Sequence, residues 1–159
     1  MRVLKAILLL IIVLELKTNL SSQVCKNFNQ SALCIIPESY DYNQYEKSRS
    51  SYVLIRKINK FEVVLNNNKD YKIGVCAPQG YEPIQFQLRE KESGKILYDN
   101  SNENNINYVT FSVDDKPITI IIEIIILATT YKPNDNRDMR TCIGIQIIYH
   151  KIINTESQY

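Results

Sequence analysis

The chain has 159 residues, of which 45% are hydrophobic, and its formal net charge is +2 at pH 7. Its basic residues do not gather into the positively charged face that a phosphate backbone needs, so nucleic acid is not an expected partner. The length suffices for one domain with a hydrophobic core and is too small for two.

The first segment predicts export. Met1–Lys5 is short and basic, and residues 6–14 form an unbroken apolar run, which is typical of a signal peptide. The run is shorter than the roughly 20 residues that span a bilayer, so we expect the signal peptide to be cleaved and no stable membrane span to remain. The alternative is that the uncleaved segment is kept as a membrane anchor. We expect cleavage near Ser22, so that residues 1–22 are the signal peptide, and without them 16 basic and 16 acidic residues remain. The expected location is secreted, periplasmic or at the cell surface.

Residues 23–50 form a polar N-terminal segment that contains Cys25 and Cys34 and then three tyrosines, Tyr40, Tyr42 and Tyr45. We expect these tyrosines to be exposed. Exposed aromatic rings can stack on sugars or anchor protein interfaces, so the three tyrosines are the candidate binding residues.

From residue 51 to residue 159 the apolar residues recur at every second position and turn residues interrupt them, which predicts many short strands. Eight runs carry this pattern: Tyr52–Ile58, Phe61–Leu65, Tyr71–Cys76, Ile84–Glu90, Lys95–Asn100, Tyr108–Val113, Ile118–Leu127 and Cys142–Lys151. The run 118–127 is rich in β-branched isoleucine and follows Pro117, so we expect a strand in the middle of a sheet. Glu123 within it either faces solvent or discourages edge-to-edge aggregation.

Alternation of apolar and polar residues predicts strands that cover a core on one side only. The expected fold is therefore all-β, an antiparallel two-sheet sandwich of about eight strands, jelly-roll-like, spanning residues 51–159. The residues expected to point inward are Ile73, Val75, Ile84, Phe86, Leu88, Val109, Phe111, Ile120, Ile122, Ile143, Ile145 and Ile147.

Four cysteines, an even number, predict two disulfides in an oxidising compartment. Three pairings are open. Cys25 and Cys34 are close in sequence, and Cys76 and Cys142 each lie in a predicted strand, which favours 25–34 with 76–142. A zinc site is the alternative, but the chain has no CxxC pair and His150 is its single histidine.

Nothing in the sequence predicts a catalytic centre. A serine or cysteine triad would have to use His150, which we expect at the rim of a strand, and the motifs of hydrolases, metalloproteases and phosphate-binding loops are missing from the printed sequence. Residues 99–103 and 134–138 are oxygen-rich and could bind calcium, but we expect solvated turns there. We expect no enzyme activity and no cofactor.

One resemblance adds to this picture, carried by Asp70–Cys76, Ile84–Glu90, Lys95–Asn100, Tyr108–Val113 and Cys142–Ile148. These runs resemble those of small exported β-sandwich proteins of Bacteroidota and, more distantly, pre-peptidase C-terminal jelly-roll domains. The resemblance implies the fold, a cysteine in each of two strands, and an accessory role. We therefore expect a non-enzymatic interaction or assembly module with a protein partner, and a module that binds a cell-surface glycan is the alternative.

Overall fold

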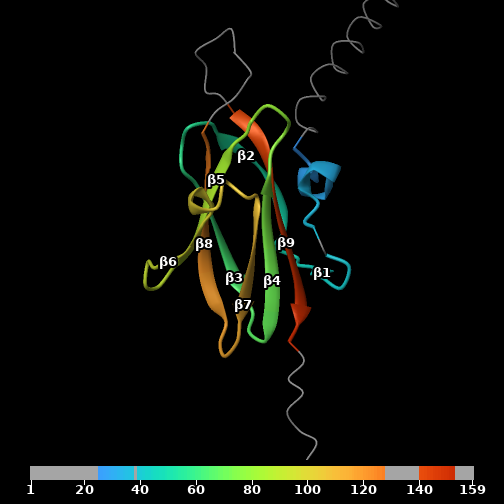
Figure 1. Cartoon of the computed structure of the whole chain (residues 1–159), viewed down its shortest axis with the longest axis vertical. Coiled ribbons are helices and arrows are strands. Elements are labelled where there is room, and N and C mark those ends of the chain that lie inside the picture. The colour runs from blue at the N-terminus through green and yellow to red at the C-terminus, as the bar shows by residue number, and fades with distance from the viewer. Residues whose placement is uncertain (1–24, 38, 128–139, 153–159) are drawn as a thin grey trace, which may run out of the picture.

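The structure is a computed structural model that describes residues 25–37, 39–127 and 140–152 (Figure 1). The predicted signal peptide and the oxygen-rich run 134–138 lie outside these ranges. The described chain forms nine strands: β1 Asn43–Gln44, β2 Arg49–Leu54, β3 Asn59–Leu65, β4 Lys69–Cys76, β5 Ile84–Glu90, β6 Ile96–Asp99, β7 Tyr108–Val113, β8 Ile118–Ile126 and β9 Arg140–Lys151.

The strands form two antiparallel sheets, which confirms the predicted all-β sandwich. One sheet has five strands in the order β1-β9-β4-β7, with β2 also paired to β9, and the other has four in the order β3-β8-β5-β6. The long strand β9 pairs with β4 along one side. Along its other side β9 pairs first with β2 and then, nearer its C-terminal end, with β1. The very apolar strand β8 lies between β3 and β5, as predicted.

The first sheet begins earlier than the sequence suggested. β1 and the start of β2 precede residue 51, and the predicted strand Tyr52–Ile58 is wrong at its end, because the chain leaves the sheet after Leu54. Arg56 has a φ of 60° in the turn that follows, a conformation that no strand residue adopts. This turn carries the chain from the five-stranded sheet to the four-stranded one.

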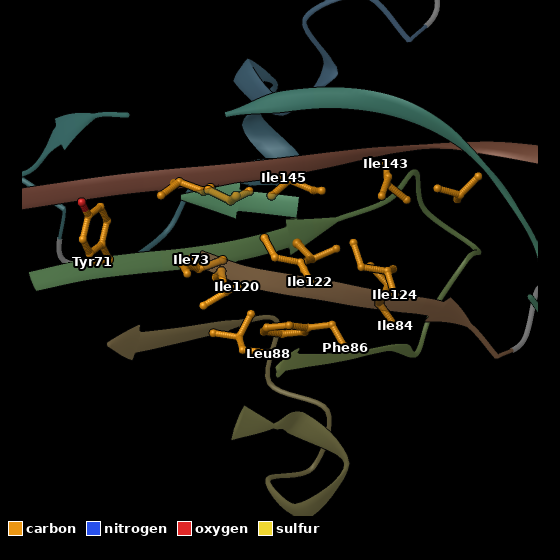
Figure 2. Packing of buried hydrophobic residues seen from close by; sticks show 14 of the residues in the cluster. Tyr71, Ile73, Ile84, Phe86, Leu88, Ile120, Ile122, Ile124, Ile143 and Ile145 are labelled. Atoms are coloured by element: carbon orange, nitrogen blue, oxygen red, sulfur yellow. The ribbon is translucent and has the colours of Figure 1, made fainter. Parts of the chain in front are cut away.

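The core lies between the two sheets (Figure 2). All twelve residues predicted to point inward belong to it: ten are buried, and Val109 and Phe111 on β7 are partly buried against it. Tyr71 is a core residue that the sequence did not predict, with 0% of its surface exposed. Its hydroxyl donates to the Asn66 carbonyl and accepts from the Asn66 N–H, so its one polar atom is satisfied. Burial raises the pKa of Tyr71 to about 12.

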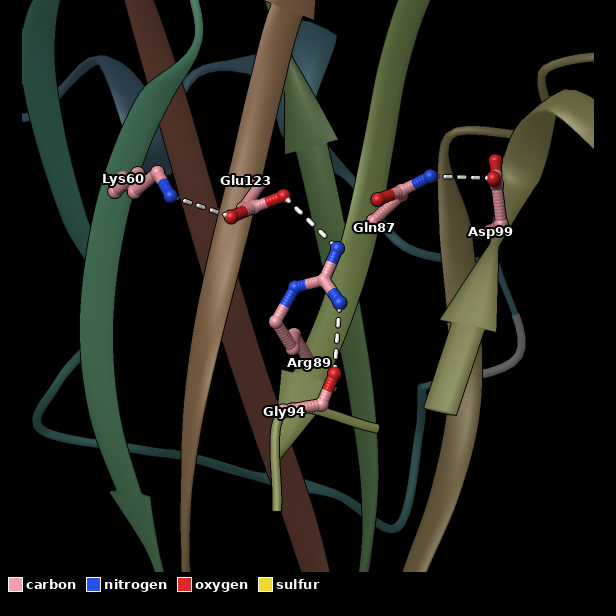
Figure 3. Close-up of polar contacts among 6 residues, drawn as sticks. All are labelled: Lys60, Gln87, Arg89, Gly94, Asp99 and Glu123. Atoms are coloured by element: carbon pink, nitrogen blue, oxygen red, sulfur yellow. Dashed lines mark hydrogen bonds and ion pairs between the residues drawn. The ribbon is translucent and has the colours of Figure 1, made fainter. Parts of the chain in front are cut away.

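Glu123 lies on the outer face of the four-stranded sheet, between two cations on the neighbouring strands (Figure 3). Its carboxylate is 2.9 Å from the Lys60 Nζ and 3.6 Å from an Arg89 guanidinium nitrogen, and its side chain is only 12% exposed. The hydrogen bond from Lys60 lowers the pKa of Glu123 below its usual 4.5, against the opposing effect of burial. The charge therefore belongs to a cross-strand network inside the sheet and is not a device at an edge.

This network predicts a stability difference that depends on pH. A carboxylate whose pKa is lowered by folding stabilises the fold above its unfolded pKa, and this contribution disappears as the pH falls through its folded pKa. We expect Glu123→Gln to be less stable than the parent at about pH 7 and the gap to shrink below about pH 4. Urea unfolding of both proteins at the two pH values measures the gap. An equal difference in the free energy of unfolding at the two pH values would show that the charge of Glu123 contributes nothing to stability.

Candidate binding surface

Two disulfides fasten the N-terminal segment across the outer face of the five-stranded sheet. Residues 25–37, here called the strap, are joined to β9 by Cys25–Cys142 and to β4 by Cys34–Cys76, with Cα–Cα distances of 5.3 and 5.2 Å. The predicted pairing of 25–34 with 76–142 is therefore wrong. Cys76 and Cys142 do lie on neighbouring strands, but Cys76 is opposite Gly144 in the register and each cysteine meets a strap residue lying over it. Two disulfides indicate a protein that folds in an oxidising compartment.

Two glycines in the middle of strands let the strap approach this closely. A Cβ added at Gly144 would lie 2.6 Å from the sulfurs of both Cys34 and Cys76 and 2.7 Å from the Cα of Asn29. A Cβ at Gly74 would lie 2.8 Å from Cγ1 of Ile36. A glycine inside a strand often marks a place where another backbone comes near, and both positions carry that signal in the sequence.

Polar contacts complete the attachment of the strap. Asn29 is buried, its backbone N–H donates to the Ser50 hydroxyl at 2.9 Å, and the same hydroxyl donates to the Asn29 side chain at 2.8 Å. At the other end, the Lys72 ammonium donates to the Pro37 carbonyl at 3.1 Å. Lys72 is only 8% exposed, so its charge is partly desolvated. Losing the hydrogen bond to the Pro37 carbonyl would therefore destabilise the fold more than losing an exposed one.

The three candidate tyrosines do not form one exposed group. Tyr40 is 97% exposed, as predicted. Tyr42 is partly buried, with its ring centroid 5.2 Å from that of His150 and 4.9 Å from the Lys72 Nζ. The expectation for Tyr45 is wrong: it is 7% exposed and its hydroxyl donates to the Val64 carbonyl at 2.8 Å.

Tyr45 is a core residue because the turn between β1 and β2 directs its ring into the sandwich. There it packs edge-on against Tyr71 and Tyr149, with centroid distances of 5.6 and 5.9 Å. Burial raises the pKa of Tyr45. The period of two does not extend into residues 40–50, so the sequence offered no signal that distinguished this tyrosine from its neighbours.

The surroundings of His150 do not form a catalytic triad. Its Nδ1 is 3.5 Å from one Asp70 carboxylate oxygen, and the Ser112 hydroxyl donates to the other. In a triad the imidazole lies between the hydroxyl and the carboxylate, whereas here the carboxylate lies between the other two groups. The side chain of His150 is 40% exposed near the end of β9, which agrees with the predicted place at a strand rim. Within the described ranges, no three histidine, cysteine, aspartate or glutamate residues are grouped to hold a metal ion.

The oxygen-rich run 99–103 is a structural turn. Asn100 is 0% exposed and its amide donates to the carbonyls of Ile84 and Ile106 at 2.9 and 3.1 Å, while its oxygen accepts from the Phe86 N–H at 2.8 Å. Asp99 accepts from the backbone and the hydroxyl of Ser101. These groups hold the connection between β6 and β7 onto β5, so the two side chains are already engaged within the fold.

Two grooves border the strap. The larger, of about 590 Å³, lies between the start of the strap and the turn from β1 to β2, and amides and hydroxyls line much of it, among them Asn27, Gln30, Gln44 and Ser48. The smaller, of about 290 Å³, lies between the end of the strap and the start of β7. Its wall includes Leu33 and Ile35, which are 58% and 70% exposed.

The sequence did not predict this apolar surface. Residues 33–36 of the strap alternate: Cys34 and Ile36 are buried against the sheet, whereas Leu33 and Ile35 point outward. The residues 33–36 are apolar on both sides of the chain, so their pattern alone does not tell which side faces solvent. The strap's position over Gly74 and Gly144 decides this.

Comparisons with known proteins give the following. No family model and no curated protein sequence matches the chain. Among solved structures, the chain is similar to PliG of Aeromonas hydrophila, a periplasmic lysozyme inhibitor of g-type lysozyme, with a TM-score of 0.42 and 5% sequence identity over 73% of this chain and 92% of that one. A similarity of this size is too low to carry a conclusion about activity or partner. No helix in the described part of the chain is long and apolar enough to cross a membrane.

Proposed function

We propose that this protein is a non-enzymatic interaction or assembly module, exported to the cell surface, the periplasm or the medium, and that it binds a protein partner. The observation that carries the proposal is the exposure of Leu33 and Ile35 on a segment that two disulfides hold rigidly on a sheet. We call the surface formed by Leu33, Ile35 and the adjacent Tyr108 the strap patch.

Three properties of the strap patch support a protein partner. Its outward side chains are large and apolar, and folding does not require them to be so, because Cys34 and Ile36 make the contacts with the sheet. The backbone beneath is fixed before binding, so little conformational entropy is lost on association. The adjacent groove can accept a side chain from a partner, which is the usual arrangement of an energetically dominant contact.

The test is a double substitution, Leu33→Ser with Ile35→Ser. We expect it to weaken binding of the partner at least about tenfold and to leave the unfolding temperature unchanged, because both side chains are already in solvent. Ile58→Ser is the matched control, since Ile58 is also 57% exposed but lies outside the strap. The partner would be isolated from envelope extracts on the parent protein and its affinity then measured with each purified variant. Equal affinity for the parent and the double variant would reject the strap patch.

A glycan-binding module remains the second candidate, because Tyr40 is fully exposed and the larger groove is rich in amides. Tyr40→Ala alone is the informative change, since Tyr42 packs against Lys72 and His150 and its removal would disturb the strap. Retention of the parent on a polysaccharide array, lost in Tyr40→Ala, would favour this candidate. The resemblance to exported proteins of Bacteroidota stays a prediction and would fit either partner.

A further inference from the structure

The free edge of β7 differs from the other edges of the two sheets. A sheet edge exposes unpaired N–H and C=O groups that can pair with another strand, and proteins usually blunt such edges with charges, short strands, bulges or covering side chains. The described strands leave four edges: β7 and the β1/β2 side in one sheet, and β3 and β6 in the other.

Three of these edges are blunted. On β3, the carbonyls of Glu62 and Val64 accept hydrogen bonds from the side chains of Arg49 and Tyr45 at 2.9 and 2.8 Å, and Lys60 adds a charge. β6 has only four residues, and its register with β5 is irregular. The β1/β2 side is interrupted by a turn, and the strap is bonded to it at Ser50.

β7 has none of these devices. It pairs with β4 without a register shift, its six residues include no charge and no proline, and no described strand lies along its other side. The Val75 N–H donates to the Asn107 carbonyl, so the backbone groups of alternate residues from 107 onward point toward β4. The backbone groups of Tyr108, Thr110 and Ser112 therefore point away from β4, toward solvent.

We propose that β7 pairs antiparallel with β7 of a second copy of this chain, forming a two-fold dimer with one continuous sheet. Pairing about an axis at Thr110 or at Phe111 places the inward residues opposite one another, so that Val109 faces Phe111 or Val113 of the second copy. Val109 and Phe111 are only partly buried in one copy and would become covered. The outward positions carry Thr110 and Ser112, whose hydroxyls are compatible across the pair.

Charge placement favours a second copy in this antiparallel arrangement. Asp114, Asp115 and Lys116 follow β7 directly, and the turn that precedes β7 carries one charge, Glu103, followed by Asn104, Asn105 and Asn107. In the two-fold pair, the two aspartates of each copy lie near the asparagines of the other, and the two Asp114–Asp115 pairs are a full strand apart. A parallel pair would bring four carboxylates together. Without residues 1–22 the chain has 16 basic and 16 acidic residues, so its net charge adds little repulsion between copies.

Thr110→Pro tests the pairing. Proline removes the N–H that faces solvent and no hydrogen bond to β4, and it is accepted on an edge strand in this orientation. The molar mass of the oxidised protein would be measured by light scattering during size exclusion at concentrations up to about 100 μM. We expect a dimer for the parent and for Thr110→Val, which keeps the N–H, and a monomer for Thr110→Pro.

A monomeric parent, an assembly larger than a dimer, or a dimer that persists in Thr110→Pro would each overturn the proposal. If Thr110→Pro does not fold, Thr110→Lys provides the same comparison, because Thr110 is exposed and a lysine at an edge opposes pairing. The strap patch is tested separately. Leu33→Ser with Ile35→Ser would remain dimeric, so failure of one proposal is distinguishable from failure of the other.

Discussion

Removing the Cys25–Cys142 disulfide, by Cys25→Ala with Cys142→Ala, is expected to lower the free energy of unfolding by about 4 to 5 kcal/mol. The bridge joins residues 117 positions apart, so its loss restores a large amount of conformational freedom to the unfolded chain. The bridge Cys34–Cys76 spans 42 residues, and its removal is expected to cost about 4 kcal/mol or slightly less. Urea unfolding of the two double variants under oxidising conditions measures both values.

Peptide mapping without reduction provides the control for this experiment. The parent should yield the cross-linked peptides 25–142 and 34–76, and each double variant should keep the bridge that was not removed. A peptide that links Cys25 to Cys34 would contradict the attachment of the strap. A double variant as stable as the parent would show that the strap contributes no constraint.

Gly144→Ala is expected to destabilise the fold by about 3 kcal/mol or more, because its added methyl group meets atoms that have no room to move. Two of these atoms are the sulfurs of the Cys34–Cys76 bridge and the third is the backbone Cα of Asn29. The strap must therefore lift from the sheet or the strands must shift. Thermal and urea unfolding would show the loss, and limited proteolysis of residues 25–37 would show whether the strap has lifted.

Gly74→Ala is the matched comparison, since it lies on the same face one strand away. There the new methyl group meets the Ile36 side chain, which can rotate, so we expect a cost of only about 1 kcal/mol. In the background that lacks Cys34 and Cys76, the effect of Gly144→Ala should decrease, because two of its three close contacts are gone. An effect of Gly144→Ala no larger than that of Gly74→Ala would show that the strap is not held tightly.

Most of the sandwich follows from local patterns. The alternation in Ile84–Glu90 and Tyr108–Val113 identified these strands to the residue, and all twelve residues predicted to point inward contribute to the core. β8 was recognised as a central strand from its β-branched residues and from Pro117, which precedes it. Such predictions succeed because a strand buried on one face has to repeat its apolar residues every two positions.

The strap and the candidate site were predicted less well from the sequence, for two physical reasons. The disulfide partners are separated by up to 117 residues, and which cysteine faces which depends on the order of strands in a sheet, which local spacing does not determine. Residues 40–50 carry no period of two, so Tyr40 and Tyr45 look alike in sequence although one is in solvent and the other is in the core. The two strand-interior glycines, Gly74 and Gly144, were the available signal for a covering segment.

In sequence, the bridge Cys34–Cys76 lies inside the loop that Cys25–Cys142 closes, and this order has a consequence for biosynthesis. In the export proposed above, Cys25 and Cys34 are made first and enter the oxidising compartment first, whereas the partner of Cys25 arrives 117 residues later, on the last of the described strands. During translocation Cys25 meets Cys34 more often than it meets Cys142, because a short loop closes more readily than a long one. A bond between Cys25 and Cys34 is therefore expected to form first. The chain therefore depends on thiol–disulfide exchange to reach its final pairing, and we expect a host that supplies a disulfide isomerase to yield more correctly bridged protein than one that supplies an oxidase alone.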